Sequence, residues 1–323
     1  MSFIKSSVLF SAIALATIPA VAQGVSAVSE EKPMSLRHRS SQGGFILTAE
    51  YYNAVKQASL KNKAGSILNW RDLDLNMAQV GAEYKGYGFT VFGGGNGPYG
   101  YMTDDDIYNK LYQISNGDVK ARYYGLDAYK RIIEEEKFSV KGGISFSRLE
   151  TDSYPRFMIS YDEAAGSGAV NIFDPRAPKA MQIYNFNNAY GYIGADVSLA
   201  EDKNFIIRLS SQIGVGFGMN QLDWRNEEGE SGMRVNSVIS PMIMFRTELG
   251  GEWWFVESMA LTLNAGYKAE EMLGTDTSTV TIDKSNMSPS DPRIDMPEEQ
   301  VGSTLESLSL SEIYGRIGLK IRI

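Results

Sequence analysis

Strict alternation between apolar and polar residues is the feature of this sequence that most limits its fold. In "MALTLNAGYK", residues 259–268, every odd position from Met259 to Tyr267 is apolar or small, whereas the even positions end in Asn264, Gly266 and Lys268. The last segment, residues 307–323, has isoleucine and leucine on one face and mainly charged residues on the other. A period of two residues is the geometry of a β-strand with one apolar and one polar face.

Ten segments of this kind follow one another along the chain. We predict strands at residues 44–59, 67–83, 87–95, 120–133, 138–151, 183–199, 204–224, 234–255, 258–271 and 307–323. The fold class predicted is therefore all-β, and a single domain is expected because the chain contains no Pro/Ser-rich linker and no internal repeat.

The connections between these segments alternate in length. Short connections are expected near Tyr84, Glu135, Asp202 and Val256, and long ones at 96–119, 152–182 and 274–306. A soluble β-sandwich would explain the alternation of residues but not these two classes of connection. Alternating connection lengths on strands with apolar outer and polar inner faces are typical of bacterial outer-membrane barrels. We predict a ten-stranded antiparallel transmembrane β-barrel with short periplasmic turns and long extracellular loops.

The N-terminus carries the features of a secretory signal peptide. Lys5 precedes the apolar run "VLFSAIALATIPA", and Ala20-Val21-Ala22 supplies a cleavage site after Ala22. We expect a signal peptide at 1–22, an N-terminal periplasmic segment at 23–43 and the barrel at 44–323. Beyond this run, no stretch approaches the roughly 20 apolar residues of a membrane helix. The predicted location is the outer membrane.

Composition argues against a disulfide framework and against nucleic acid as a partner. The chain has no cysteine, so no disulfide framework holds it together. Removal of Lys5 with the signal peptide leaves 30 basic residues against 39 acidic ones, a net charge near −9. Such a balance argues against nucleic acid as a partner.

The C-terminal residues and two groups of side chains fit the barrel prediction. In "RIGLKIRI", the spacing of Arg316, Gly318, Ile321 and Ile323 resembles the assembly signal of outer-membrane barrels. An aromatic girdle at a periplasmic turn is expected from Trp253, Trp254 and Phe255. Ion pairs inside the lumen, with acids such as Glu248 and Glu312, are expected for Arg208, Lys268, Arg316, Lys320 and Arg322.

Three consecutive acids, Asp104, Asp105 and Asp106 in "YMTDDD", follow a glycine-rich run. The residues alone leave several readings open: a solvated loop tip, the start of a short helix whose dipole favours acids, a calcium site, or half of a catalytic centre. Consecutive acids lack the one-apart ligand spacing of a calcium loop, which disfavours a metal at this position.

The sequence resembles the omptins, a family of ten-stranded outer-membrane endopeptidases. "SILNWRDLDLNMAQVGAEY", with Ser66, Leu68 and Trp70, is similar to the second strand of the family. "GYMTDDDI" resembles its acidic D-x-D motif and maps the two catalytic aspartates onto Asp104 and Asp106. The strands at 190–226 are similar to its sixth and seventh strands, which end in D-x-H; here that motif reads Asp223-Trp224-Arg225.

The resemblance implies a mechanism in which an Asp and His pair polarises a water for attack on a peptide carbonyl, while the Asp pair opposite holds that water. Such chemistry needs a group that titrates near neutral pH. Arg225 stands at the histidine position, and arginine stays protonated and cannot accept the proton. The one histidine, His38, precedes the first strand and is expected in a solvated basic segment on the periplasmic side.

Specificity and lipid binding are also implied by the resemblance. The family prefers basic residues because acids line its cleft, but here Gln221 stands two residues before Asp223. The first strand ends in three cations, Lys56, Lys61 and Lys63, and Asp105 is a further cleft position. Arg148 matches a lipopolysaccharide-binding arginine, but Ile144 and Phe146 stand where an aromatic residue and an acid are expected. Lipopolysaccharide is then the expected activator, and no metal or other cofactor is implied.

Asp223 and Arg225 share the parity of the lipid-facing Phe217 and Met219, so a bulge is needed to turn them inward. The function predicted is an omptin-like outer-membrane endopeptidase, degenerate at Arg225 or active by altered means, with a peptide or protein substrate at the extracellular face. The alternative is a non-catalytic outer-membrane barrel acting as an adhesin, a lipopolysaccharide-binding protein or a structural element. A porin is a weaker third reading, because charged side chains fill a ten-stranded lumen.

Overall fold

The structure, a computed structural model, describes residues 44–62, 67–96, 101–105, 114–162, 167–171, 182–225, 231–237, 240–273, 278–282, 299–302 and 305–323. Within these ranges no helix is long and apolar enough to cross a membrane. The predicted signal peptide and periplasmic segment, residues 1–43, lie outside the described residues.

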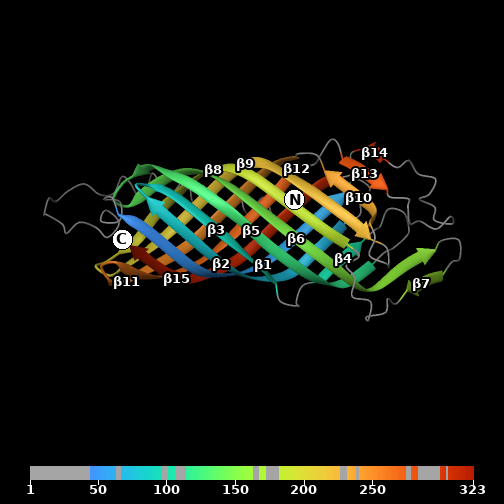
Figure 1. Ribbon diagram of the computed structural model, residues 1–323, viewed down its shortest axis with the longest axis horizontal. Coiled ribbons are helices and arrows are strands. Elements are labelled where there is room, and N and C mark those ends of the chain that lie inside the picture. Colours follow the sequence, from blue (N-terminus) through green and yellow to red (C-terminus); the bar gives the residue numbers. More distant parts are fainter. Residues whose placement is uncertain are drawn as a thin grey trace.

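Ten antiparallel strands close into a barrel (Figure 1). Strand β1 pairs with both β2 and β15, and β9 pairs with β11 to complete the ring. The barrel strands are β1 (Phe45–Asn62), β2 (Ile67–Tyr84), β3 (Tyr87–Asn96), β5 (Ile114–Glu134), β6 (Phe138–Asp162), β8 (Gln182–Glu201), β9 (Phe205–Arg225), β11 (Ser240–Val256), β12 (Met259–Leu273) and β15 (Leu305–Arg322). The predicted fold class is confirmed.

Five shorter strands lengthen this sheet at one end of the barrel (Figure 1). They are β4 (Tyr101–Asp105), β7 (Ser167–Asn171), β10 (Ser231–Ser237), β13 (Ser278–Ile282) and β14 (Glu299–Gly302). We call this end the long-loop end. The single strand predicted at 234–255 is wrong in part, because β10 and β11 are separate strands that both pair with β9.

The opposite end, the short-turn end, is made of tight connections. Lys85 and Gly86 form the β2–β3 turn, both with positive φ, at 49° and 78°. Gly86 adopts this conformation without steric cost because it has no Cβ. The two ends of the barrel sequence meet here, where the Phe45 amide donates to the Ile323 carbonyl at 3.0 Å. The short connections expected near Tyr84, Glu135, Asp202 and Val256 are therefore confirmed, whereas parts of the three expected long connections belong to strands β4, β5, β6, β7, β13 and β14.

Side chains alternate between lumen and outer surface as the period of two requires. On β1, Ala54 and Lys56 are buried, whereas Val55 between them is 41% exposed. The outer surface carries a band of exposed apolar side chains, including Leu47, Val80, Phe89, Val91, Ile144, Phe146, Ile193, Ile213, Val215, Phe217, Ile243, Leu263, Ile313, Ile317 and Leu319. Such a band is what a hydrocarbon phase requires of a barrel exterior.

Two of the three residues expected in the aromatic girdle face outward. Trp253 and Phe255 are exposed on the outer surface near the short-turn end. Trp254 lies between them, so alternation turns it into the lumen, where it is 3% exposed and stacks 4.6 Å from the Arg322 guanidinium. Trp254 therefore closes the lumen at this end and does not anchor the barrel in lipid.

Lumen tyrosines lie across glycines on neighbouring strands. A Cβ on Gly266 would stand 2.5 Å from the Tyr314 ring, and one on Gly88 would stand 2.1 Å from that of Tyr129. These two glycines provide the space for a large ring to fill the lumen without pushing the strands apart.

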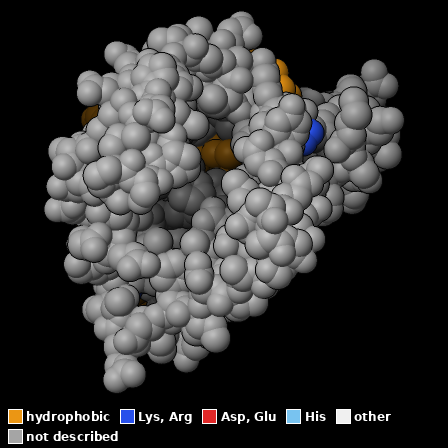
Figure 2. Space-filling model, turned by 90° about the vertical axis from the view of Figure 1, so that its right-hand side faces the viewer, with side chains coloured by type: hydrophobic (Ala, Val, Ile, Leu, Met, Phe, Trp, Pro, Cys, Tyr) orange, Lys and Arg blue, Asp and Glu red, His pale blue; other side chains and the backbone are white. Residues whose placement is uncertain are grey.

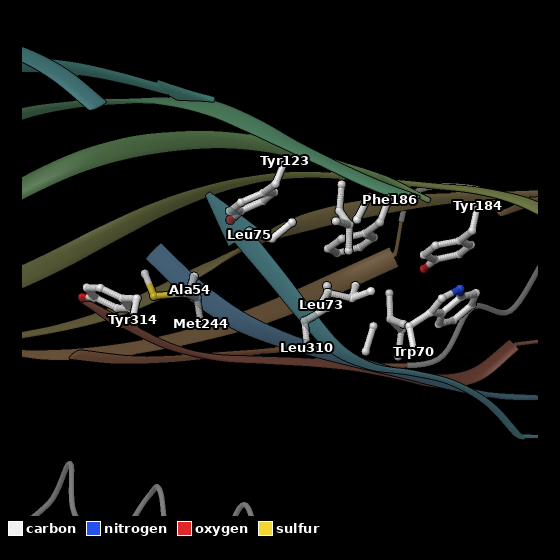
Figure 3. Packing of buried hydrophobic residues seen from close by; sticks show 14 of the residues in the cluster. Ala54, Trp70, Leu73, Leu75, Tyr123, Tyr184, Phe186, Met244, Leu310 and Tyr314 are labelled. Carbon is white, nitrogen blue, oxygen red and sulfur yellow. The ribbon is translucent and has the colours of Figure 1, made fainter. Parts of the chain in front are cut away.

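The lumen is blocked by apolar side chains toward the long-loop end (Figure 3). Nine of these side chains are at most 2% exposed, and we call them the apolar septum: Trp70, Leu73, Leu149, Tyr184, Phe186, Met242, Met272, Leu308 and Leu310. The rings of Trp70 and Tyr184 stack at 4.6 Å between centroids. Residues on strands β2 and β8, which are not neighbours in the sheet, thus meet across the lumen.

Below the septum, toward the short-turn end, the lumen is filled by ion pairs. The predicted pairing of interior charges is confirmed in the bonds Arg208–Glu252 at 2.9 Å, Lys268–Glu270 at 2.9 Å, Arg316–Glu248 at 2.5 Å and Lys320–Glu252 at 2.8 Å. Two cavities of about 210 and 180 Å³ remain among these polar side chains. Cavities of this size and polarity accommodate ordered water.

Candidate functional site

The acidic triplet begins on a strand. Tyr101–Asp105 form β4, which pairs with β2 on one side and β5 on the other. Strand β4 therefore continues the third barrel strand, β3, beyond the glycine-rich run that separates them. This corrects the readings of Asp104 and Asp105 as a loop tip or a helix start. Asp106 lies outside the described residues.

The backbone register gives Asp104 the same strand parity as Trp70. Met102 pairs with Trp70, whose side chain is buried in the lumen, and Asp104 pairs with Leu68 two residues further on. Positions two apart on a strand share a face. Asp104 therefore has lumen parity, and Asp105 has the opposite one.

This parity depends on a bulge in β2. Leu73 and Trp70 both face the lumen although they are three residues apart, because Gln57 on β1 stands opposite two residues, Arg71 and Asp72. Asp72 has φ 52°, the left-handed conformation found in such bulges. Without the extra residue, Trp70 would turn to the outer surface.

The second predicted wall is the end of β9. Leu222 pairs with Tyr184 and Asp223 with Ile183, and the β8–β9 register runs without interruption from Gln182↔Trp224 to Ser198↔Arg208. The irregularity nearby is on β10, between Ser231 and Met233. The pairing of β8 with β9 therefore contains no bulge that would turn Asp223 inward. Asp223 keeps the outer-face parity of Phe217.

The two walls nevertheless stand at one level of the barrel. Trp70 is two positions from the partner of Asp104, Tyr184 is the partner of Leu222 next to Asp223, and the two rings stack on each other. The Tyr184 hydroxyl donates to Asn220 Oδ1 at 2.6 Å, one residue before the predicted cleft position Gln221. Strands β4 and β9 thus bring the predicted catalytic positions to the same height on different parts of the ring.

One of the three cations predicted for the cleft lies elsewhere. Lys56 is 1% exposed in the lumen, where it donates to Glu312 at 2.8 Å and lies 4.0 Å from the Tyr123 ring. The prediction for Lys56 is wrong because β1 continues past it as a lumen-facing strand as far as Asn62. Lys61 is a β1 residue near that end, and Lys63 lies outside the described residues.

Arg148 faces outward, beside the exposed Phe146 on the same strand. It forms a 2.7 Å ion pair with Glu150, which Arg122 also contacts at 3.2 Å. We call this group the outer-face cluster; its members are Arg122, Tyr124, Arg148, Glu150 and Asp152.

Sequence reasoning found Arg148 and missed the other four members. The signal was present in the period of two, because Arg148, Glu150 and Asp152 alternate on β6 directly above the apolar Ile144 and Phe146. A run of charges on the lipid-facing parity marks the point where the strand leaves the hydrocarbon.

Among the described residues, no group of three or more His, Cys, Asp or Glu side chains is placed to hold a metal ion. The described side chains of this end consist of a paired, outward-facing set of arginines and the apolar septum in the lumen.

Comparison with known proteins identifies the architecture. The sequence matches no protein-family model, and no curated protein matches it. Among solved structures, the outer membrane protease OmpT from Escherichia coli superposes with a TM-score of 0.61 at 10% identity, covering 88% of this chain and 97% of that one. The translocator domain of the autotransporter NalP from Neisseria meningitidis matches at a TM-score of 0.36 and 10% identity, covering 99% and 98% of the two chains.

At this identity the likeness to OmpT establishes the fold and not the activity. The chain has the fold of an outer-membrane barrel. In the view onto the long-loop end, described hydrophobic side chains show between the outer atoms (Figure 2).

Proposed function

We propose that this protein is an omptin-like outer-membrane endopeptidase, exported through its N-terminal signal peptide, whose peptide cleavage is slowed by Arg225. The observation that supports this best is the stacked Trp70–Tyr184 pair. This pair brings the strand positions of Asp104 and Asp223 to one level of the barrel, between the filled lumen and the long-loop end.

In the proposed reaction, Asp104 and Asp106 hold a water molecule against a peptide carbonyl. Asp223 takes the proton that a histidine would otherwise accept, since the Arg225 guanidinium cannot. A neighbouring guanidinium favours the ionised carboxylate and so weakens it as a base. Loss of a well-matched general base costs about 10²- to 10⁴-fold in rate. The mechanism also requires Asp223 to turn toward the cleft, against the parity of β9.

We further propose that lipopolysaccharide contacts Arg148 and Arg122. Both arginines face outward immediately above an exposed apolar strand face, and Arg122 remains 62% exposed despite its pairing with Glu150. Arginine binds phosphate groups through two parallel hydrogen bonds. Lipopolysaccharide phosphates at this height would compete with Glu150 and Asp152 for the two guanidinium groups.

A second candidate is a non-catalytic surface barrel that keeps the scaffold and the lipid contact. Arg225 at the histidine position and the outer-face parity of Asp223 favour it. The two candidates differ in whether peptide bonds are hydrolysed.

The deciding experiment is cleavage of a fluorogenic peptide library by the folded, lipopolysaccharide-supplemented protein. The proposal predicts slow cleavage that Asp104→Asn with Asp106→Asn abolishes. Asp74→Asn is the matched control, because it removes an exposed acid on the outer face of β2 that lies outside the proposed cleft, and it should leave cleavage within about twofold. Absence of cleavage, or cleavage that survives the double change, would establish the non-catalytic barrel instead.

A further inference from the structure

The Trp70–Tyr184 contact joins two strands that the sheet keeps apart. Strand β2 is separated from β8 by β3, β5 and β6 in the ring. The two rings meet at 4.6 Å with an interplanar angle of 24°, and both residues are 0% exposed (Figure 3). The contact therefore spans the lumen near the long-loop end.

Each ring is seated beside one of the predicted catalytic strands. Trp70 pairs with Met102 of β4, two residues before Asp104. Tyr184 pairs with Leu222 of β9, one residue before Asp223. A change in the separation of the two rings would therefore be transmitted directly to both strands.

The β8 side of the contact is fixed by further bonds. The Tyr184 hydroxyl donates to Asn220 on β9, and the Asn220 amide donates to Met272 Sδ on β12 at 3.2 Å. Gly218 leaves room for this packing, since a Cβ there would lie 2.2 Å from Met272 Cε. Tyr184 thus cannot follow a movement of Trp70 without disturbing β9 and β12.

We propose that Trp70 and Tyr184 are positioning residues that act as a strut, holding the β4 and β9 strands at a fixed separation. This inference deepens the proposed function and rests on it for its catalytic consequence. Strands that extend beyond a barrel are braced by fewer neighbours, whereas catalytic groups must stay within about 0.5 Å of their productive geometry. A rigid aromatic contact across the lumen supplies that restraint.

The ring face of Trp70, and not its N–H, carries this role. Trp70 Nε1 is buried and has no hydrogen-bond partner among the described residues. A phenylalanine would keep an aromatic face toward Tyr184 and remove the unpaired donor. Trp70→Phe is therefore the conservative variant that should preserve the strut, and Trp70→Ala the variant that removes it.

The absence of cysteine allows a direct distance measurement in the full mature chain. Thr103→Cys on β4 and Ile183→Cys on β8 place spin labels on outer-parity positions next to the strut. Pulsed electron paramagnetic resonance in lipopolysaccharide-containing vesicles should give one narrow distance in the parent. Trp70→Ala should at least double the width of the distribution, and Trp70→Phe should restore it.

Phe92→Ala is the matched control. Phe92 is a lumen aromatic that packs against Tyr123 at 5.2 Å but takes no part in the septum contact, so its loss should leave the width unchanged. If Trp70→Ala does not fold, Tyr184→Leu tests the same contact from β8. A distribution as narrow as that of the parent in whichever of these two variants folds overturns the strut.

Kinetics separate this proposal from the proposed function. In a cleaving parent, Trp70→Ala should lower kcat by roughly tenfold to a hundredfold with KM within about twofold, and Trp70→Phe should recover it. A matching fall in the Phe92→Ala control would contradict the positioning role. A parent that cleaves nothing overturns the proposed function, while a broadened distance in Trp70→Ala would still support the strut.

Discussion

Lys56 was predicted at the substrate cleft, but the structure buries it in the lumen. It is 1% exposed, bonded to Glu312 at 2.8 Å, 3.8 Å from Glu270 and within reach of the Tyr123 ring. The lumen around it also holds Lys268, so two cations and two acids balance in one layer. Its charge is compensated inside the barrel and does not repel a substrate.

Replacing Lys56 with methionine should destabilise the barrel strongly. The change leaves Glu312 buried with Tyr52 as its remaining hydrogen-bond donor, and removal of one partner of a buried pair costs about 3–5 kcal/mol. Urea unfolding of the protein in detergent micelles measures this. The double variant Lys56→Met with Glu312→Leu removes both charges and should recover most of the loss; a single-variant cost below about 1 kcal/mol would show that the pair contributes little.

Pairing of the interior charges was predictable, but the partners were not. Any charge facing a closed lumen must find an opposite charge, so alternation alone assigned Arg208, Lys268 and Arg316 to ion pairs. Which acid each one meets depends on the stagger between strands and on side-chain length. That is why Glu252 and Glu270 were not anticipated as partners.

At the scale of elements, the bulge at Asp72 decides which side chains enter the septum. It lets Trp70 face the lumen together with Leu73 and Leu75. A backbone φ of 52° is tolerated by Asp or Asn, favoured by Gly and strained for a residue with a β-branched side chain.

Asp72→Gly should therefore leave stability unchanged or slightly raised, whereas Asp72→Val should cost about 1–3 kcal/mol. Ala78→Val is the matched control, since Ala78 is an exposed outer-face residue of the same strand outside the bulge. Thermal unfolding followed by circular dichroism gives the ranking. Equal stability of the Asp72→Val and Ala78→Val variants would show that the bulge carries no strain.

Sequence analysis missed strand β4 because the residues before it do not alternate. The run "FGGGNGPYG" has no alternating side chains, so the period of two disappears before β4 begins. Strands β10 and β11 were predicted as one segment although alternation stops at Val238 and Ile239, two consecutive apolar residues.

At the scale of the whole molecule, side chains of the described residues close the lumen at both ends. The apolar septum blocks it toward the long-loop end, and Trp254 with Ile46 and Ile206 fills the short-turn end. Between these two ends lie polar cavities of about 210 and 180 Å³, which share Tyr129, Lys141 and Glu248 in their walls.

The protein should consequently show no steady conductance in planar bilayers. Insertion of the folded barrel is checked in the same membrane by resistance to added protease, and a trimeric porin serves as the conducting control. Reproducible open-channel steps from this protein would contradict a closed lumen and would revive the porin reading.

The ring of ten strands could be predicted because barrel closure needs nothing beyond alternation and connection length. The level of the septum could not, because it depends on the stagger that places Trp70 of β2 against Tyr184 of β8. Of the candidate site, the register gives strand parity alone: Asp104 shares the parity of the lumen-facing Trp70, and Asp223 shares that of the outward-facing Phe217. The catalytic roles of both residues stay predictions.

The account depends most on Arg225, and the change Arg225→His tests it most directly. Cleavage of the best library peptide by this variant should rise about 10²- to 10⁴-fold. The gain should appear as pH increases through roughly 6.5, where the imidazole loses its proton and becomes a base. Arg225→Lys, which keeps the charge, should show no gain. If Arg225→His cleaves no faster than the parent at any pH, the β9 wall takes no part in catalysis and the endopeptidase proposal is contradicted.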